Sequence, residues 1–187
     1  MAINTIGVVG MGQMGSGIIE TCARAGIDVI GRDISAEFVA KGLNNIKKSL
    51  SKGVERGKLT PAEMASALGK IKSTTALADF AHCDLVIEAA TENMQLKKTL
   101  FTELDVIAGP NALLASNTSS LSITEIASAT QRPDRVVGLH FFNPVPVMPL
   151  LEIVRGLLTS EDTLDAMRQL GEQLDKTEMD EINVRIE

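Results

Sequence analysis

The feature that most constrains this chain is a glycine-rich turn near its start, Gly10-Met11-Gly12-Gln13-Met14-Gly15. An apolar, β-rich run at residues 3–9 leads into the turn, and a helix-forming segment at residues 16–25 follows it. A strand, a glycine turn and a helix in this order are typical of a dinucleotide-binding site. The order therefore predicts a βαβ unit around which the rest of the fold is built.

Each glycine of the turn has a geometric reason. Gly10 permits the tight turn, Gly12 lets backbone approach a pyrophosphate, and Gly15 lets the helix pack closely on the sheet. Asp33 follows Gly15 by about 18 residues, close to the roughly 20 expected of an acid that binds a ribose 2′-hydroxyl. The acid predicts NAD rather than NADP, although Arg32 beside it leaves room for a 2′-phosphate. The alternative is an ordinary βα turn that contains three glycines.

Composition excludes several classes of protein. The chain has 187 residues, 44% of them hydrophobic, which suffices for one buried core. Its net charge is −6, and it contains neither Trp nor Tyr, so nucleic-acid binding is not expected. Cys22 and Cys83 lack a CxxC partner and are expected to be buried thiols in a reducing compartment, with metal binding as the remote alternative. Without a basic leader or a long apolar stretch, the sequence predicts a cytoplasmic protein with no membrane span.

Strand-like and helix-like segments alternate along the rest of the chain. Apolar runs predict strands at residues 27–30, 84–90, 112–115, 135–140 and 150–154, and residues 71–74 are a candidate for a further short strand. Helical spacing predicts helices at residues 35–58, from residue 60, at 96–107 and at 164–174. This alternation predicts an α/β fold of the Rossmann type, a doubly wound and mostly parallel sheet with helices on both faces. In such a sheet, ligands bind beyond the carboxyl ends of the strands.

The segment after the second strand predicts a long basic helix that begins at Ser35. Apolar residues recur at spacings of three or four from Val39 to Val54, so one face is expected to pack on the sheet. Its other side carries Lys41, Lys47, Lys48, Lys52, Arg56 and Lys58. From composition, a solvated face is the simpler interpretation. The alternative is a patch for a phosphorylated substrate, because local positive charge on an acidic molecule concentrates anions there.

Polar side chains follow the later strands at the points where they end. Glu92 follows residues 84–90, and Ser119 follows residues 112–115. His140 ends the run at residues 135–140, and Asn143 follows it. Because the carboxyl ends of parallel strands share one edge of the sheet, these residues are expected to converge on the glycine turn.

His140 is the candidate for proton transfer. The chain turns back after it through several prolines to Glu152, and antiparallel neighbours of this kind can bring a carboxylate beside an imidazole. That contact would fix the tautomer and favour protonation, leaving the other ring nitrogen for a substrate hydroxyl. The alternative is a capping histidine and an exposed glutamate. The other histidine, His82, is expected in a surface loop.

Four motifs resemble a known family: Gly10-Met11-Gly12-Gln13-Met14-Gly15-Ser16-Gly17, Val86-Ile87-Glu88-Ala89-Ala90-Thr91-Glu92-Asn93, Ser116-Asn117-Thr118-Ser119-Ser120-Leu121 and His140-Phe141-Phe142-Asn143-Pro144. In this order and at this spacing they look like the L-3-hydroxyacyl-CoA dehydrogenases, and most of all their bacterial 3-hydroxybutyryl-CoA branch. The resemblance covers residues 3–171.

The resemblance implies an NAD-linked interconversion of a 3-hydroxyacyl-CoA and a 3-oxoacyl-CoA, in fatty acid or butanoate metabolism. It implies that His140 is the general base, that Glu152 orients it, and that Ser119 contacts substrate and cofactor. Asn143 would lie near the nicotinamide. Two further positions match family residues that contact the cofactor, Glu92 and Lys97.

The resemblance also bears on the basic helix, which corresponds to the family's CoA-contacting region. Lys52 and Arg56 are then the candidates for the CoA phosphates, and no metal site is expected. Two other functions stay open. One is a dehydrogenase of a hydroxy acid without CoA, and the other is a non-catalytic nucleotide-binding module.

After residue 176 the sequence departs from the family's pattern. The family continues into a Val-rich strand, a Pro-Gly-Phe turn with a catalytic Asn, and a helical domain that closes the cleft and forms a homodimer. Residues 177–187 instead resemble an atypical acidic tail that is expected to pack poorly, and Asn183 is not assigned the catalytic role. The expectation is an NAD-binding domain at residues 1–176 without the C-terminal dimerisation domain, as in a fragment or after a change of reading frame. Turnover and dimerisation of this chain alone are expected to be weak or absent.

Overall fold

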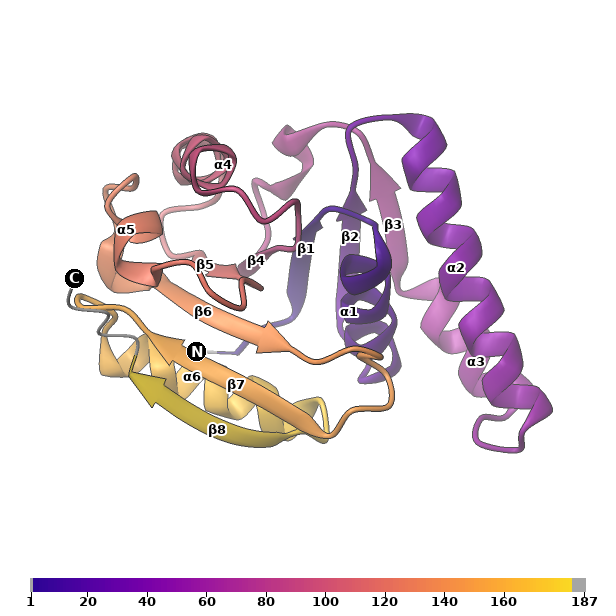
Figure 1. Ribbon diagram of the computed structural model, residues 1–187. Helices are drawn as coiled ribbons and strands as arrows, with labels where there is room; N and C mark the ends of the chain where they lie inside the picture. Colours follow the sequence, from indigo (N-terminus) through magenta and orange to yellow (C-terminus); the bar gives the residue numbers. More distant parts are fainter. Residues whose placement is uncertain (1, 183–187) are drawn as a thin grey trace.

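A single mixed sheet forms the centre of the fold in the computed structural model, which describes residues 2–182 (Figure 1). The strand order is β3-β2-β1-β4-β5-β6-β7-β8. Neighbouring strands are parallel except β6 and β7, which are antiparallel. The strands are β1 (Thr5–Val9), β2 (Asp28–Arg32), β3 (Ile71–Thr74), β4 (Leu85–Glu88), β5 (Leu113–Ser116), β6 (Val136–Phe141), β7 (Leu150–Arg155) and β8 (Thr177–Ile182).

Helices cover both faces of this sheet, so the predicted Rossmann-type fold is confirmed. The α-helices are α1 (Gln13–Arg24), α2 (Ala36–Glu55), α3 (Pro61–Gly69), α4 (Met94–Ile107), α5 (Ile123–Ala127) and α6 (Glu161–Gln173). Short 3₁₀ helices lie at η1 (Leu77–Phe80) and η2 (Pro133–Arg135).

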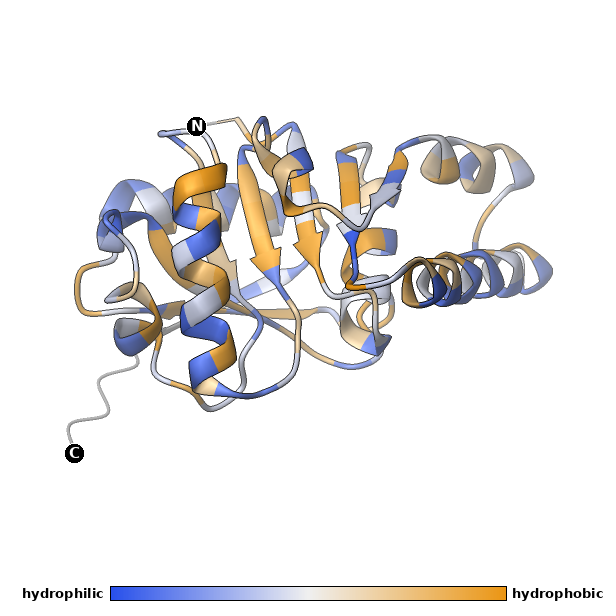
Figure 2. Cartoon of the chain, turned by 90° about the horizontal axis from the view of Figure 1, so that it is seen from above, coloured by the Kyte–Doolittle hydropathy of each residue, from blue (hydrophilic) through white to orange (hydrophobic). Residues whose placement is uncertain are grey.

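The hydrophobic core forms one layer on each face of the sheet, because successive side chains of a strand point to opposite faces. In β4, Leu85 and Ile87 belong to the cluster that also contains α1 and α6 residues. Val86 belongs to the cluster formed with α4 and α5. A strand buried on both faces is therefore mostly apolar, although β4 ends in the buried Glu88, and Figure 2 shows such strands between helices with hydrophilic outer surfaces.

Short polar signals set the helix boundaries. The Ser35 side chain accepts a hydrogen bond from the Phe38 N–H at 3.3 Å, and Thr60 and Glu63 form a reciprocal capping box at the start of α3. Beyond the end of α1, Gly26 has φ +84°, the left-handed conformation that glycine adopts most readily. The predicted start of the long helix at Ser35 is thus confirmed, with Ser35 as the N-cap of α2.

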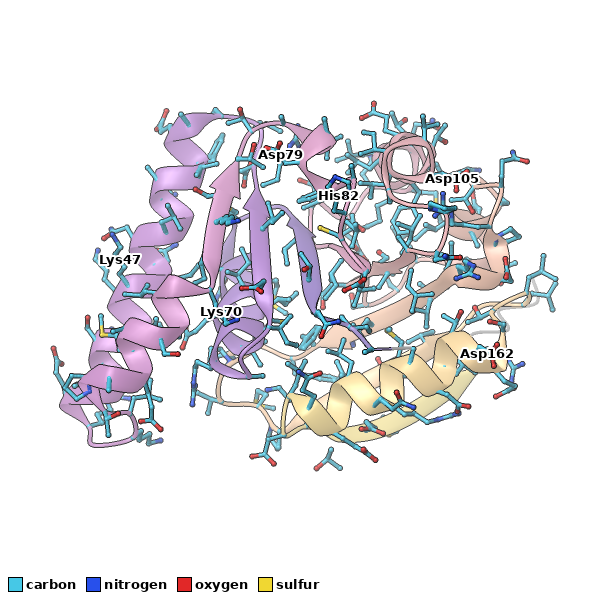
Figure 3. The ribbon with its side chains drawn as sticks, turned by 180° about the vertical axis from the view of Figure 1, so that it is seen from behind. Lys47, Lys70, Asp79, His82, Asp105 and Asp162 are labelled. Carbon is cyan, nitrogen blue, oxygen red and sulfur yellow. The ribbon has the colours of Figure 1, made fainter. Side chains whose placement is uncertain are left out.

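The long basic helix α2 packs mainly against α1 and α3. The prediction that it packs on the sheet is therefore wrong. It lies beyond β3, and Lys47 is exposed on it (Figures 1 and 3). Ile46 and Leu50 are buried as expected, but their neighbours are helical. Gly42 allows a close crossing, because a Cβ there would lie 2.6 Å from the Cβ of Met11. An apolar stripe shows that a helix buries one face, but it does not show whether a sheet or another helix covers that face.

Residues 177–182 also differ from the prediction. They form β8, which pairs in parallel with β7 from Leu150–Thr177 to Arg155–Ile182. The expected poorly packed tail is therefore wrong for these residues. Since β8 lies at one end of the described sheet, its backbone pairs with one neighbour, and a polar sequence is compatible with such an edge. Asn183 and the remainder of the predicted tail lie outside the described residues.

Candidate dinucleotide site and proton-transfer pair

The glycine turn leaves an open cradle at the start of α1. Gly10 has φ +94°, and a Cβ on Gly15 would lie 1.7 Å from the Gly10 carbonyl oxygen. A Cβ on Gly12, in contrast, would meet nothing within 4 Å. Gly12 is also the N-cap of α1 and caps it with no side chain, so the first N–H groups of the helix face this open space. The open cradle fits a pyrophosphate, which binds at helix N-termini through such groups.

Asp33 holds the turn against the end of β2. One carboxylate oxygen accepts the Met11 N–H at 2.7 Å, and the other accepts the Ile34 N–H at 2.7 Å. An ionised carboxylate keeps further acceptor sites after two such bonds. Asp33 also lines a cleft of about 620 Å³ together with Gln13 and Asn143. Its carboxylate is thus placed where a ribose hydroxyl beside the pyrophosphate could donate to it.

A second hollow continues from this cleft along α2. Glu20, Ser49 and Pro146 line both of them. The second hollow measures about 290 Å³ and is lined by Lys52 and Arg56. Lys52 and Arg56, the two residues predicted to bind phosphates, therefore line one hollow, which adjoins the cleft at the glycine turn.

Two residues of this region, Arg24 and Ser49, were missed by sequence reasoning. Arg24 lines the second hollow and lies 4.0 Å from the carboxylate of Glu20, one helical turn earlier. Burial raises the pKa of Glu20, against a hydrogen bond from Ser49 and the charge of Arg24. Helical spacing could have placed Arg24 beside Glu20. Helical spacing could not show that Ser49 of α2 lies beside Glu20 of α1, because the two helices meet only in the tertiary structure.

His140 and Glu152 are directly opposite each other in β6 and β7. Their side chains meet at 2.7 Å between Nδ1 and Oε2, which confirms the predicted contact. An ionised carboxylate can only accept, so Nδ1–H donates and Nε2 is left for another partner. The two side chains are 17% and 14% exposed, which excludes the alternative of an exposed glutamate. The Phe142 ring lies 4.5 Å from the imidazole and is tilted by 53°, so it limits the orientations of the ring.

A buried ion pair lies at the carboxyl end of β4, which β5 separates from β6. The ammonium of Lys97 is 2.8 and 2.9 Å from the two carboxylate oxygens of Glu88, and these side chains are 1% and 0% exposed. Ser116 donates its hydroxyl hydrogen to Glu88 at 2.7 Å. Glu88 and Ser116 were not predicted as site residues. The available signal was a charged residue inside an apolar strand, since a buried charge requires a partner.

Glu92 connects this ion pair to Ser119. Its carboxylate accepts hydrogen bonds from the Thr118 hydroxyl and from the Ser119 N–H, the latter at 3.3 Å, and lies 3.3 Å from Lys97. Burial alone would raise the pKa of Glu92, but the Thr118 hydrogen bond and the Lys97 charge outweigh it and hold the pKa below its usual range. Lys97 is therefore engaged with two carboxylates. Its predicted contact with a cofactor stays a prediction.

The remaining predictions concern residues outside the cleft. His82 is exposed in the loop before β4 (Figure 3), and Cys22 and Cys83 are buried free thiols, as predicted. Among the described residues, no helix is long and apolar enough to cross a bilayer. Within the same range, no group of three or more His, Cys, Asp and Glu side chains is arranged to hold a metal ion.

The doubly wound sheet, the open glycine cradle and the acid at the end of β2 together define a Rossmann-type dinucleotide-binding domain. The sequence profile described as "3-hydroxyacyl-CoA dehydrogenase, NAD binding domain" matches residues 5–182. The chain belongs to this family, which confirms the resemblance and the prediction of NAD as the cofactor. The match includes β8 and so extends past the predicted boundary at residue 176.

Individual relatives agree with this assignment. The chain is 49% identical over 177 residues to the probable 3-hydroxybutyryl-CoA dehydrogenase of Bacillus subtilis, covering 95% of this chain and 62% of that protein. It is 52% identical over 161 residues to the 3-hydroxybutyryl-CoA dehydrogenase of Mycobacterium tuberculosis, covering 86% and 56%. The crystal structure of (S)-3-hydroxybutyryl-CoA dehydrogenase from Ralstonia eutropha superposes with a TM-score of 0.95 at 48% identity, covering 97% of this chain and 64% of the other. The chain thus spans less than two thirds of the length of these relatives.

Proposed function

We propose that the protein acts as an NAD-dependent 3-hydroxyacyl-CoA dehydrogenase, with 3-hydroxybutyryl-CoA as its substrate, in fatty acid or butanoate metabolism. The observation that carries the proposal is the 2.7 Å contact between His140 and Glu152. It lies at the same edge of the sheet as the glycine cradle. A base beside a nicotinamide site is what the oxidation of an alcohol requires, because a proton and a hydride must leave together.

His140 takes the proton of the substrate's 3-hydroxyl group on Nε2 as the C3–H bond breaks. Glu152 accepts from Nδ1–H, orients the ring and stabilises the imidazolium that forms. Bound NAD supplies the acceptor for the hydride that leaves C3. In the reverse direction His140 returns the proton to the oxygen of the 3-oxoacyl-CoA.

The proposed NAD site extends along the carboxyl ends of the strands. The pyrophosphate is assigned to the turn at residues 10–15 and the adenosine ribose to Asp33. Glu92, Ser119 and Asn143 are assigned to the nicotinamide end, with Ser119 also contacting the substrate. The geometry favours an indirect role for Lys97, which holds Glu92 in place.

The acyl-CoA is assigned to the hollow along α2. Lys52 and Arg56 line it together with Arg24, and the whole chain carries a net charge of −6. A cationic hollow on an acidic protein attracts phosphate groups specifically to that place. This favours a CoA thioester over a hydroxy acid that lacks phosphates.

Fluorescence titration of NADH, with and without acetoacetyl-CoA, followed by steady-state NADH oxidation, tests the proposal. We expect NADH to bind, acetoacetyl-CoA to alter that binding, and any turnover of acetoacetyl-CoA to exceed that of free acetoacetate. The variant His140→Ala is expected to lose turnover and to keep the NADH dissociation constant of the unaltered chain. Equal rates with both substrates would identify a dehydrogenase without CoA specificity. NADH binding that acetoacetyl-CoA leaves unchanged would identify a nucleotide-binding module.

Location and assembly complete the proposal. The buried thiols Cys22 and Cys83 are compatible with a cytoplasmic location, because unpaired cysteines persist in reducing compartments. The family resemblance ascribes a homodimer to the C-terminal helical domain, so the oligomeric state of this chain is left to sedimentation equilibrium of the purified protein.

A further inference from the structure

Lys176 lies just before β8 and reaches back to the loop that follows β6. Its ammonium donates hydrogen bonds to the carbonyl oxygens of Val145 at 2.7 Å and Met148 at 2.6 Å. The next residue, Thr177, donates its N–H to the Pro149 carbonyl at 2.7 Å. The connection between α6 and β8 therefore holds the loop at residues 143–149 by several of its carbonyl groups.

These carbonyl groups depend on an outside donor. Within the loop, the N–H groups of Val147 and Met148 both donate to the Pro144 carbonyl at 3.0 Å, so the turn satisfies that oxygen by itself. The Val145 and Met148 carbonyl oxygens accept their hydrogen bonds from the Lys176 ammonium. Burial, and to a lesser extent the charge of Arg24, lowers the pKa of Lys176. Charge-assisted hydrogen bonds to two carbonyls offset the cost of placing the ammonium there.

The loop held in this way is one wall of the cleft beside the glycine turn. Residues 143–146 line that cleft, and the Asn143 amide oxygen accepts from Gln13 Nε2 at 3.2 Å. Val145 is 2% exposed and abuts α1, because a Cβ on Gly17 would lie 2.9 Å from the Val145 Cβ. A tightly packed contact leaves little room for independent movement. A displacement of the loop would therefore move Asn143 relative to the glycine turn.

We propose that Lys176 is a positioning residue of the NAD site: by holding residues 143–149 it places Asn143 at the nicotinamide end of the cofactor. This inference rests on the proposed function, which assigns Asn143 to that end. Lys176 does not touch the cofactor in this arrangement. It acts through the loop, as groups behind a binding residue fix its orientation.

Comparing NADH with ADP-ribose, which lacks the nicotinamide, tests the inference by isothermal titration calorimetry. For Lys176→Met we expect the NADH dissociation constant to rise roughly tenfold, since small misplacements of a positioned group have effects of this size. The ADP-ribose dissociation constant is expected to stay within about twofold, because the glycine cradle and Asp33 are intact. Lys72→Met, the same change at an exposed lysine on β3, is the matched control and is expected to change neither constant. A general loss of structure would weaken both ligands alike and would overturn the inference.

Two further variants separate positioning from bulk stability. Lys176→Arg retains donors for both carbonyls and is expected to restore NADH affinity to within about threefold of the unaltered chain. In the Asn143→Ala background, Lys176→Met is expected to add less than about a twofold loss, because both changes act on one contact. Failure of the arginine variant to restore affinity, or full additivity with Asn143→Ala, would overturn the inference. If Lys176→Met lacks a cooperative thermal transition, Lys176→Gln, which retains an amide donor, takes its place in each comparison.

The outcomes also distinguish this inference from the proposed function. If the unaltered chain does not bind NADH, both are overturned. If the unaltered chain binds NADH and Lys176→Met binds it equally well, the inference alone is overturned.

Discussion

Replacing Lys97 with Met removes the positive charge from a buried network and is expected to destabilise the fold. Lys97 and Glu88 are 1% and 0% exposed, and removing one partner of a buried ion pair costs about 3–5 kcal/mol. Glu88 would keep hydrogen bonds from Ser116 and from the Ala90 N–H at 2.7 and 2.6 Å, and Glu92 is 41% exposed to water. We therefore expect the lower end of the range, about 3 kcal/mol. For a domain of this size, that loss lowers Tm by roughly 6–12 °C.

The neighbouring lysine provides a matched control. Lys98 is on the same helix, but its side chain is 32% exposed and pairs at 3.4 Å with Glu125, which is 51% exposed. An exposed pair of this kind contributes about 0–1 kcal/mol, so Lys98→Met is expected to change stability little. The double variant Glu88→Gln, Lys97→Met removes both buried charges together. It is expected to recover much of the loss, because the single variant is penalised for an uncompensated charge.

Urea unfolding followed by far-UV circular dichroism measures these differences, provided that the slope with denaturant is the same for all variants. The reasoning is refuted if Lys97→Met and Lys98→Met have the same free energy of unfolding. It is also refuted if the double variant is no more stable than Lys97→Met. Either result would mean that the Lys97 charge does not compensate Glu88 in the folded protein.

Three other expectations are open to direct measurement. Gly12→Ala is expected to weaken NADH binding roughly tenfold or more without shifting the urea midpoint, because the added Cβ meets nothing within 4 Å; a shifted midpoint would contradict this. Burial raises the pKa of Cys22 and Cys83 to about 12, so Ellman's reagent at pH 8 is expected to react with them only on unfolding, and prompt colour with the native protein would count against it. Burial raises the pKa of Glu92, but the Thr118 hydrogen bond and then the Lys97 charge outweigh burial, so folding lowers the pKa. The resulting stability is present above the unfolded-state pKa and is lost as pH falls through the folded one. The stability difference between the unaltered chain and Thr118→Val should thus shrink on acidification in urea titrations, and a constant difference would disprove it.

Patterns within one element predicted that element well. The apolar run at residues 150–154 predicted a strand that the structure places at Leu150–Arg155, because such a run is a local property of the sequence. The helix at Ile123–Ala127 was not predicted, since five residues are too few to show a helical period. The strand at residues 177–182 was missed because its polar sequence has no apolar pattern, and its pairing with β7 depends on backbone groups that any sequence carries.

Within the candidate site, too, some contacts could be predicted from the sequence and others could not. The pairing of His140 with Glu152 could be predicted because a short antiparallel return limits which residues can be opposite each other. The partners of Lys97 could not, because Glu88 lies in an apolar strand and meets Lys97 only when α4 folds back over the end of β4. The roles of Lys176 and Arg24 were not visible for the same reason.

The sequence by itself determined the glycine cradle, the alternation of strands and helices, and the polar residues at the strand ends. These follow from the missing Cβ of Gly12 and from the period of apolar side chains, both of which act over a few residues. Only the tertiary structure decided that α2 packs on helices, that Lys97 lies between two carboxylates and that Lys176 holds the loop bearing Asn143. Such contacts form between elements that are far apart in the sequence. The spacing of residues within one element therefore does not show where two elements meet in space.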